Sequence, residues 1–490
     1  MATAIKPLST YNGPTQLLID GQWREAISGK RFETVNPATG EVITTVAEAD
    51  KADIDLAVKA ARKAFEEGPW SKTTATDRGR ILSKLADLIM EHRDELAELE
   101  TMDNGKPISD ARNVDVPLVA DCLEYYAGWA NKVHGETIPV PGPFLNYTLR
   151  EPIGVVGQIV AWNFPMLLAA WKLGPALATG NTVVLKPAEQ TPLSALRLGE
   201  LGLEADIPPG VVNVLPGFGP TAGSALVTHP DVDKIAFTGE YITGQTIMRE
   251  AAGTLKRISF ELGGKSPNII FADADLDAAV AGSLMGIFWN QGEVCCAGSR
   301  LFLQESVYDQ FMDKLVGQAG KMKVGDPMDP STQIGALISE DHLNKVLRYI
   351  SSGKAEGATV RTGGDQPTKR GYFVNPTIFD GVNDSMKIAR EEIFGPVLSV
   401  IRFKDMDEVV PRANNTFYGL AAAVWTRDVG KAHAMARKLK AGTVWVNTYN
   451  MISSLSPFGG YKMSGFGREL GVHALESYTQ VKSVWVSLPN

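Results

Sequence analysis

Short runs of β-branched residues alternate with helix-length stretches from about residue 150 onward, and this alternation limits the possible fold more than any other feature. The first runs are GVVGQIVAW, NTVVLKP, VVNVLPG and KIAFTG, and glycine or proline bounds them. Because parallel strands are joined by crossover connections that are usually helices, the alternation predicts a parallel sheet covered by helices. A second series, RLFLQE, YFVNPTIF, VLSVIRF, LAAAVWT and GTVWVN, begins at residue 300 and predicts a second such sheet.

Two further segments, residues 137–152 and 476–486, have strand-like alternation but belong to neither series. They predict a small β arm for oligomerisation. The predicted fold class is therefore α/β, with two doubly wound parallel-sheet (Rossmann-like) domains and this arm. Before these segments, the apolar spacing from Ile81 to Leu99 predicts one amphipathic helix that Gly105 and Pro107 end.

The charge balance argues against several classes of partner. Lys and Arg number 48 against 56 Asp and Glu, for a formal net charge of −8, which argues against a nucleic-acid binder. The most apolar long window, residues 166–185, contains Lys172, and the N-terminus lacks the apolar core of a signal peptide. We therefore expect a cytoplasmic protein without membrane partners.

Cysteine and histidine usage excludes other classes of site. Only three cysteines are present, and Cys295 and Cys296 are adjacent, so no disulfide framework is expected. The six histidines are dispersed, without His-x-x-x-His or Cys-x-x-Cys spacing, so we expect no metal.

Three turns that follow predicted strands could bind a nucleotide. LPGFGPTAG carries Gly219 in a glycine-rich turn, and FTGEYITG could present free backbone N–H groups to a phosphate. In LKPAEQTP, Lys186 and Glu189 lie beyond a strand's carboxyl end, where open α/β sheets bind ligands. Taken alone, each turn gives only a weak signal, and an ordinary loop is favoured for LPGFGPTAG and LKPAEQTP.

Three side-chain settings could carry chemistry. Glu261 lies between Phe260 and Leu262, and an apolar setting suits a carboxylate to accept a proton near neutral pH. The alternative is an ion pair with Lys265. Asn163 in AWNFP could bind an oxyanion or cap a turn. The cysteine pair lies among glycines and polar residues, where a helix start could lower a thiol pKa, but buried structural cysteines fit as well.

Together these segments resemble the aldehyde dehydrogenase superfamily over nearly the whole chain and in the same order. The resemblance is carried by WNFP, LKPAEQTP, GFGPTAG, FTG, FELGGKSP, NQGEVCCAGSR, EEIFGPV, WVN and PFGGYKMSGFGRELG. It implies cofactor-binding segments at 1–130 and 150–261, a catalytic domain at 262–465, and an oligomerisation arm at 131–149 and 470–490. It also implies a homodimer or homotetramer.

The resemblance implies the following chemistry. Cys295 is the nucleophile and Cys296 a bystander, because the family cysteine is the one directly before Cys or Thr and then Ala-Gly. Asn163 and the Cys295 N–H stabilise the oxyanion, Glu261 is the general base, and Lys172 and Glu469 relay its proton. The product of a small-molecule aldehyde is then its carboxylic acid.

The cofactor implied by the resemblance is NAD, with NADP less favoured because a carboxylate at Glu189 repels a 2′-phosphate. The implied cofactor residues are Ile159, Val160, Ala161, Trp162, Lys186, Glu189, Gly219, Phe237, Thr238, Gly239, Glu240, Leu262, Glu392 and Phe394. Glu240 departs from the serine that the family commonly has after FTG. We expect its side chain to turn away from the pyrophosphate, to cap its own helix, or to lie near a bound cation.

By the same mapping the substrate pocket is apolar and aromatic. Its implied residues are Phe164, Leu167, Trp171, Trp289, Val294, Ile452 and Phe458. None of them is cationic, which predicts a preference for aliphatic or aromatic aldehydes over semialdehydes that carry a charge. Two other classes stay open: a cysteine hydrolase that uses Cys295, Glu261 and Lys265, and a non-catalytic protein on a dehydrogenase fold.

Overall fold

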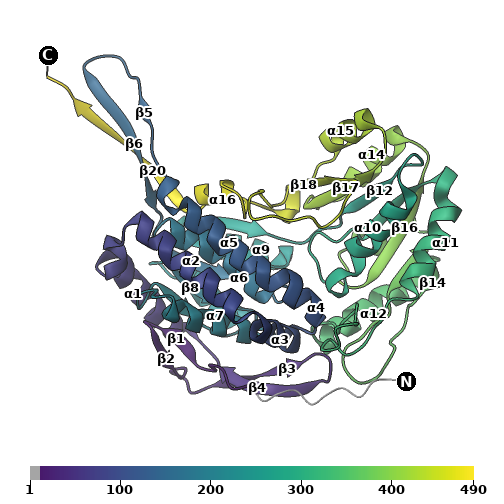
Figure 1. Ribbon diagram of the computed structural model, residues 1–490, viewed down its shortest axis with the longest axis horizontal. Helices are drawn as coiled ribbons and strands as arrows, with labels where there is room; N and C mark the ends of the chain where they lie inside the picture. Colours follow the sequence, from purple (N-terminus) through teal and green to yellow (C-terminus); the bar gives the residue numbers. More distant parts are fainter. Residues whose placement is uncertain (1–10, 490) are drawn as a thin grey trace.

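The computed structural model describes residues 11–489 as two lobes and a projecting arm (Figure 1). Each lobe has a central sheet with helices on both faces, which confirms the predicted α/β class. The chain passes from the first sheet to the second between Glu261, where β11 ends, and Pro267, where β12 begins. The short link between the sheets therefore starts at the predicted base.

The larger lobe contains an eight-stranded sheet whose five central strands are parallel. In spatial order the strands are β19 (Gly465–Phe466), β11 (Arg257–Glu261), β10 (Lys234–Thr238), β7 (Val155–Ile159), β8 (Thr182–Lys186), β9 (Val212–Val214), β1 (Leu17–Ile19) and β2 (Gln22–Arg24). Strands β7, β8 and β10 are buried along their whole length, as the apolar runs predicted.

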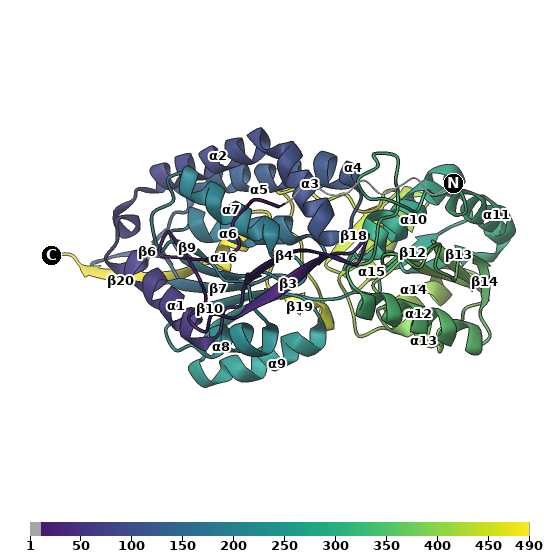
Figure 2. The ribbon, with the colours of Figure 1, turned by 90° about the horizontal axis from the view of Figure 1, so that it is seen from below.

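Helices cover both faces of this sheet (Figure 2). One face carries α1 (Lys51–Glu66), α8 (Ser224–Thr228) and α9 (Tyr241–Ala251). The other carries α2 (Ala75–Glu91), α3 (Arg93–Asn104), α5 (Val116–Trp129), α6 (Pro165–Ala178) and α7 (Leu193–Glu204), with the short α4 (Ile108–Asp110) beside them. The β hairpin of β3 (Arg31–Asn36) and β4 (Glu41–Ala47) runs below the lobe in Figure 1.

The single helix predicted across residues 81–99 was wrong. α2 ends at Glu91 and α3 begins at Arg93, because the backbone at His92 leaves the helical region with a ψ of 17°. Acidic side chains at Asp94 and Glu95 favour a new helix start there, since they complement the positive end of the helix dipole. The predicted stop at Gly105 is correct, and its φ of 91° is the left-handed conformation that ends a helix.

The smaller lobe contains a seven-stranded sheet, parallel except for one edge strand. The strands are β14 (Thr359–Thr362), β15 (Thr377–Asp380), β16 (Val397–Phe403), β13 (Arg300–Gln304), β12 (Pro267–Ile270), β17 (Ala421–Trp425) and β18 (Thr443–Val446). Helices α10 (Leu276–Phe288) and α11 (Tyr308–Ala319) cover one face. On the other face lie α12 (Glu340–Ala355), α13 (Lys387–Arg390), α14 (Met406–Asn414) and α15 (Val429–Lys438).

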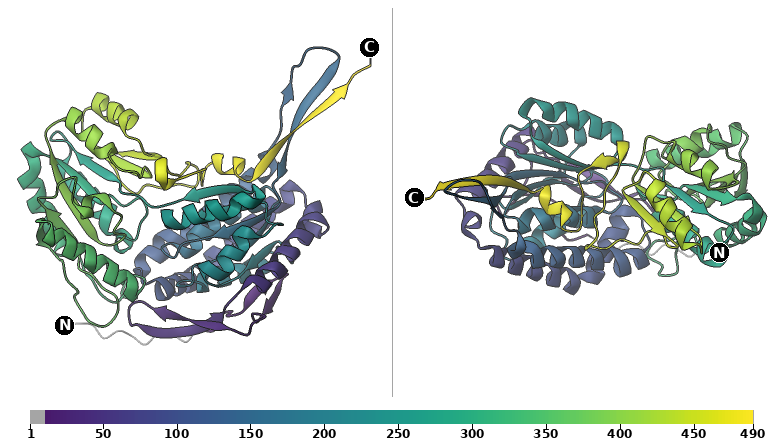
Figure 3. Two further views of the ribbon diagram at one scale, coloured as in Figure 1. Left: turned by 180° about the vertical axis from the view of Figure 1, so that it is seen from behind. Right: turned by 90° about the horizontal axis from the view of Figure 1, so that it is seen from above.

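The arm is an antiparallel sheet of β5 (Thr137–Ile138), β6 (Phe144–Pro152) and β20 (Thr479–Ser487) that extends away from both lobes (Figure 3). Residues 473–476, at the start of the predicted arm segment 470–490, instead form α16 (His473–Glu476). None of the helices within residues 11–489 has the length and apolar character needed to cross a bilayer.

Candidate active site

A cavity of about 520 Å³ lies between the lobes, and Cys295, Glu261 and Asn163 all line it. Asn163 comes from the segment between β7 and α6, Glu261 from the end of β11, and Cys295 from the loop after α10. Residues far apart in the sequence thus meet where the carboxyl ends of two parallel strands of the larger lobe face the smaller lobe. This is the place where open α/β sheets bind ligands.

A left-handed turn positions Cys295. Asn290, Gln291 and Gly292 have φ angles of 50°, 54° and 74°, and a non-glycine residue held in this region costs about 1–3 kcal/mol. The turn is held in place because the Asn290 side-chain amide donates to the carbonyl oxygens of Asn163 and Glu293, each at 3.2 Å. Strain held by buried hydrogen bonds is typical of a site that orients one side chain.

The two adjacent cysteines occupy different environments. Both line the cavity, but Cys295 is half-buried, whereas Cys296 is 1% exposed. The Cys296 sulfur lies 3.6 Å from Asn450 Oδ1, and Tyr449 donates a hydrogen bond to the Cys296 carbonyl at 2.8 Å. Side-chain contact with Cys296, and then burial, raise the pKa of the Cys295 thiol well above its usual value.

Cys295 therefore rests as a thiol, and it needs a base to become a nucleophile. The sequence suggested that a helix start could lower its pKa. No helix begins at Cys295, and although the Cys296 backbone N–H lowers the pKa, its effect is outweighed.

Asn163 is 3% exposed, and its amide faces the Cys295 loop. Its Nδ2 donates to the Glu293 carbonyl at 3.0 Å, which uses one of its two hydrogens. The other Nδ2 hydrogen has no acceptor among the described residues and is left for a ligand. Within residues 11–489 the Oδ1 atom has no hydrogen-bond partner either.

Glu261 is buried, and its Oε2 has no hydrogen-bond partner in the described part of the chain. Burial, and next the nearby Glu469, raise its pKa well above 4.5, whereas Lys172 acts in the opposite direction. Lys265 Nζ is likewise without a partner among the described residues, so the ion pair considered from the sequence is not formed. A buried carboxylate with a raised pKa suits proton transfer near neutral pH.

Lys172 and Glu469 form a buried ion pair next to Glu261. Lys172 Nζ, on α6, donates to Glu469 Oε1 and to Thr238 Oγ1, the latter at 2.6 Å. Lys172 is fully buried and Glu469 is 5% exposed. Segments from α6, from β10 and from the chain after β19 thus bring a second carboxylate, Glu469, and a lysine, Lys172, together behind Glu261.

Eight of the fourteen predicted cofactor residues line the cavity: Ala161, Trp162, Thr238, Gly239, Glu240, Leu262, Glu392 and Phe394. The other six lie outside it: Ile159, Val160, Lys186, Glu189, Gly219 and Phe237. Ile159 in β7 pairs in register with Lys186 in β8, so both residues lie at the carboxyl ends of neighbouring parallel strands.

Lys186 and Gly219, two of these outlying residues, belong to segments that lie close together. Lys186 Nζ donates to the Pro187 carbonyl at 2.9 Å and to Glu189 Oε2 at 3.2 Å. A Cβ placed on Gly223 would lie 3.8 Å from Lys186 Cδ, so the Gly219–Gly223 turn is close to this lysine. Nothing described lies within 4 Å of a Cβ placed on Gly219, which leaves open space for a ligand there.

Glu392 and Phe394 lie at the opposite end of the predicted cofactor set. Gly264 N donates to Glu392 Oε1 at 2.8 Å, and burial raises the pKa of Glu392 to about 7. Phe394 has a φ of 62°, and its ring packs edge-on against Trp162 with centroids 5.2 Å apart. His342 Nε2 donates to the Phe394 carbonyl at 2.6 Å. His342 and its helix neighbour Lys345 also line this cavity, and no sequence motif indicated them.

Glu240 has an exposed side chain at the cavity edge. It is the N-cap residue of α9 by position, but its carboxylate makes no capping hydrogen bond to the described backbone. The expected side-chain cap was therefore wrong. No group of three or more potential metal ligands is found within residues 11–489, so no bound cation is supported beside it. Its charge raises the pKa of Glu392.

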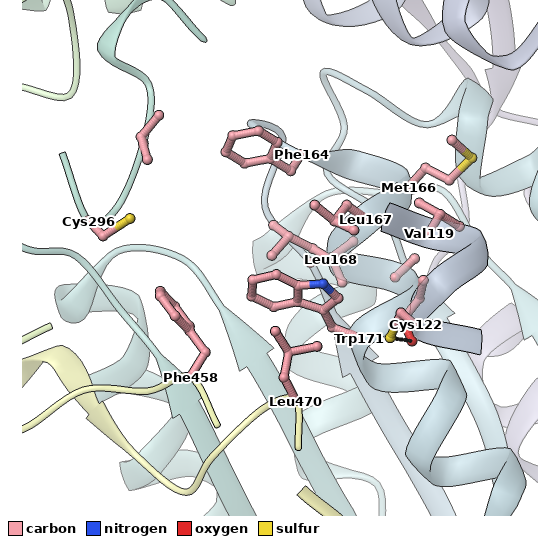
Figure 4. Close-up of a cluster of buried hydrophobic side chains, with 14 of the residues drawn as sticks. Val119, Cys122, Phe164, Met166, Leu167, Leu168, Trp171, Cys296, Phe458 and Leu470 are labelled. Atoms are coloured by element: carbon pink, nitrogen blue, oxygen red, sulfur yellow. Dashed lines mark hydrogen bonds between the residues drawn. The ribbon is translucent and has the colours of Figure 1, made fainter. Parts of the chain in front are cut away.

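All seven predicted substrate residues line the same cavity. Phe164 and Trp289 rings lie 5.2 Å apart, and Trp171 and Phe458 rings 5.5 Å apart. Figure 4 shows Phe164, Leu167, Leu168 and Trp171 on one side and Cys296 and Phe458 on the other. The sequence analysis missed several apolar lining residues, because no local motif marks them: Val114, Leu118, Leu168, Met285 and Met451.

Comparisons with known proteins agree over nearly the whole chain. The model of the aldehyde dehydrogenase family matches residues 23–484. The human mitochondrial aldehyde dehydrogenase is 56% identical over 476 residues, which cover 97% of this chain and 92% of that protein.

Solved structures agree as well. A Bacillus cereus aldehyde dehydrogenase in complex with NAD has a TM-score of 0.97 and 52% identity, covering 99% of this chain and all of that one. An indole-3-acetaldehyde dehydrogenase of P. syringae, AldA, in complex with NAD has a TM-score of 0.96 and 47% identity, covering 98% and 97% of the two chains.

Proposed function

The chain belongs to the aldehyde dehydrogenase family and oxidises aldehydes with NAD, and we propose that it does so through a thioester on Cys295. The observation that carries this proposal is that Cys295, Asn163 and Glu261 all line one cavity between the lobes. A nucleophile, an oxyanion donor and a base are the three groups that such a reaction requires.

The residues around the cavity fit NAD. The exposed oxygen atoms of Glu189 suit the hydroxyls of one ribose, and Glu392 suits those of the other. Lys186 can give a further donor, because only two of its hydrogens are used. A 2′-phosphate would meet the Glu189 carboxylate, so NAD is favoured over NADP. When bound, NAD supplies the acceptor for the hydride that the aldehyde carbon loses.

The positions of these residues also indicate the role of each part of the chain. We infer that segments 1–130 and 150–261 hold the cofactor and that 262–465 carries the nucleophile.

The arm bears exposed apolar side chains, namely Ile138, Phe144, Leu145, Leu149, Val481 and Trp485. Such a patch on a projecting sheet favours pairing with another subunit. Trp485→Asp should therefore reduce the mass measured by light scattering, and an unchanged mass would argue against the arm as the contact.

The first step is attack by sulfur. Glu261, the base at the same cavity, takes the proton of the Cys295 thiol and passes it toward the Lys172–Glu469 pair. The sulfur then bonds to the carbonyl carbon, and the carbonyl oxygen becomes an oxyanion. The second N–H of Asn163 and the Cys295 backbone N–H donate hydrogen bonds to it. Such donors act strongly where water is excluded, as in this apolar cavity. Loss of the hydride then leaves a thioester on Cys295.

The second step is hydrolysis of the thioester. Glu261 removes a proton from water, the water oxygen attacks the thioester carbon, and the carboxylic acid leaves as Cys295 becomes a thiolate again. The proton held by Glu261 can pass toward the Lys172–Glu469 pair, which lies next to it. After burial, this pair has the largest influence on the pKa of Glu261: Glu469 raises it and Lys172 lowers it.

The lining around the aldehyde favours uncharged substrates. The aromatic rings of Phe164, Trp171, Trp289 and Phe458 surround it, and the cavity's one lysine, Lys345, acts on Glu392 at the cofactor end. We propose medium-length aliphatic and aromatic aldehydes as the substrate class. AldA of P. syringae, an indole-3-acetaldehyde dehydrogenase, supports an aromatic substrate by similarity.

One experiment tests this function against its alternatives. Purified wild type and Cys295→Ala are mixed with NAD and aldehydes, and NADH formation is followed. We expect turnover by wild type and none by the variant, with Cys122→Ala, a buried cysteine outside the cavity, as the matched control. Hydrolysis of nitriles or amides without NAD would favour a cysteine hydrolase, and inactivity in every assay would favour a non-catalytic role.

A panel of aldehydes tests the substrate class. Hexanal and benzaldehyde should have higher kcat/KM values than succinic semialdehyde, because no cation in the aromatic part of the cavity can balance a carboxylate. The reverse order would refute the proposed class while leaving the thioester chemistry intact.

A further inference from the structure

A buried charge cluster lies directly behind the segment that carries Asn163. Lys106 follows the end of α3 and is fully buried. Its Nζ lies 2.5 Å from Asp115 Oδ2 and 4.0 Å from Glu100 Oε1, and both carboxylates are also buried. The reaction steps above use none of these three residues.

Three residues at the end of α3 contact three positions on the Asn163 segment. Asn104 Nδ2 donates to the Trp162 carbonyl at 2.8 Å. Lys106 Nζ lies 4.2 Å from the centroid of the Phe164 ring, a cation–π distance. Met166 N donates weakly to Glu100 Oε1 at 3.5 Å.

These contacts lie on both sides of Asn163. Because the residues immediately before and after it are held, the direction of its side-chain amide is fixed by its neighbours as well as by its own bond to the Glu293 carbonyl. The Phe164 ring in turn packs 5.2 Å from Trp289, the first residue of the turn before Cys295. Lys106 thus contacts a ring that joins the oxyanion donor's segment to the nucleophile's loop.

We propose that Lys106, together with Asn104, is a positioning residue that aims the Asn163 amide at the oxyanion. This inference rests on the proposed function, since it requires Asn163 to be an oxyanion donor. The cation holds the face of the Phe164 ring, and Asn104 holds the Trp162 carbonyl. A buried ion pair is by itself weak evidence for stability, because the cost of desolvating two charges can exceed their attraction. A role in positioning gives a reason for burying this one.

The test is a double-mutant cycle between Lys106→Met and Asn163→Ala. The rate constant of the first NADH burst with saturating benzaldehyde reports attack by Cys295 and the oxidation that follows. We expect Asn163→Ala to slow it about 10²–10³-fold. Lys106→Met should slow it about 10–100-fold, since a small misplacement of a catalytic group costs up to about 10²-fold. KM and the dissociation constant of NADH should change less than about threefold.

The double variant decides the result. If Lys106 acts through Asn163, the double variant is no slower than Asn163→Ala within about threefold. The matched control is Lys431→Met, because Lys431 also pairs with an aspartate, Asp273 at 3.2 Å, and lies 4.8 Å from a phenylalanine ring, Phe271, away from the cavity. This control should leave the burst unchanged alone and in combination.

Loss of Lys106 leaves two buried carboxylates without their cation, and the variant could unfold for that reason. Lys106→Met/Asp115→Leu removes the paired charge as well, and such replacements are often neutral for stability. If Lys106→Met has a lowered midpoint of thermal unfolding, Lys106→Met/Asp115→Leu takes its place in the double-mutant cycle with Asn163→Ala.

The outcomes separate the two proposals. An Asn163→Ala enzyme with a normal burst would overturn its role as oxyanion donor. A slow Asn163→Ala enzyme combined with multiplicative losses in the double variant would leave that role intact and overturn the positioning role of Lys106. A normal burst in a folded Lys106 variant would do the same.

Discussion

Two pairs of glutamates lie around the cavity, and they differ in how their charge is balanced. Glu261 and Glu469 lie beside Lys172, which is in direct contact with Glu469. Glu240 and Glu392 have no lysine or arginine nitrogen within 4.0 Å in the described residues, and Lys345 and Lys265 act on Glu392 only at longer range. One pair includes a carboxylate in direct contact with a lysine, whereas the other has no such contact.

The difference fits the tasks proposed for the two regions. A carboxylate that must take up and release a proton needs a pKa set by fixed neighbours, and Lys172 and Glu469 supply them. A carboxylate that binds ribose hydroxyls needs free acceptor oxygens, and Glu392 has only one short contact, from Gly264. Glu240 fits neither task, since its charge opposes a pyrophosphate and no cation balances it.

The largest effect is expected at the pair of Glu261 and Glu469. Glu261→Gln removes the base while keeping the side-chain shape, so kcat should fall about 10²–10⁴-fold. Steady-state NADH formation measures this loss. Glu305→Gln, an exposed glutamate on the smaller lobe, is the control and should leave kcat unchanged. Activity near the wild-type level in Glu261→Gln would mean that Glu261 is not the base, and the two pairs would then not differ in their catalytic role.

The pH dependence of kcat tests how the neighbours set the pKa of Glu261. The base works when deprotonated, so the rate should rise as pH rises through its folded-state pKa, which burial raises. Removing the cation with Lys172→Met should move this rise to higher pH. Removing the anion with Glu469→Gln should move it to lower pH. Each pH unit of displacement changes the rate below the pKa tenfold.

Two displacements in the same direction would contradict the assignment of opposite effects to Lys172 and Glu469. An unchanged profile in both variants would mean that Glu261 does not limit the rate. Thermal unfolding of each variant controls for a loss of folded protein.

A smaller effect is expected at the pair of Glu240 and Glu392. Glu240→Ser should lower the dissociation constant of NAD about twofold to fivefold, because exposed charge pairs are worth roughly 0.2–1 kcal/mol. Fluorescence titration measures it. Glu391→Ser is the matched control, since Glu391 is exposed nearby but does not line the cavity. Unchanged or weaker binding in Glu240→Ser would show that Glu240 does not oppose the cofactor.

The smallest effect is expected at Cys296, which belongs to neither pair. Its sulfur is buried, and a serine hydroxyl can replace its contacts with Asn450 and with the Cys295 side chain. Cys296→Ser should therefore keep kcat within about threefold in the steady-state assay. Complete loss of turnover would mean that Cys296, rather than Cys295, is the nucleophile.

Much of the fold could be predicted because its signals are local. The apolar runs at residues 155–159, 182–186 and 234–238 lie in buried strands, since a strand covered on both faces must be apolar along its length. The helix break at His92 escaped prediction because the apolar spacing continues across it. The break is visible only in the backbone angles.

The candidate site was predicted in part for the same reason. Cys295, Asn163 and Glu261 stand in short motifs with strong local character. Val114 and Leu118 stand in helical segments that look ordinary, Lys106 stands in the loop after α3, and only packing brings them to the site. Glu240 was recognised as unusual from the sequence, but its exposed direction and missing cap depend on the geometry at the start of α9.

The sequence by itself determined the two parallel sheets and the family, and it pointed to the proposed reactive side chains, because residue type and spacing act locally. Only the tertiary structure decided which charges balance one another. Lys172 meets Glu469 across 297 positions of sequence, and Lys106, in the loop after α3, meets the Phe164 ring from a remote segment. The pKa of a buried group depends on such distances, and distances between remote segments are set by how the elements pack.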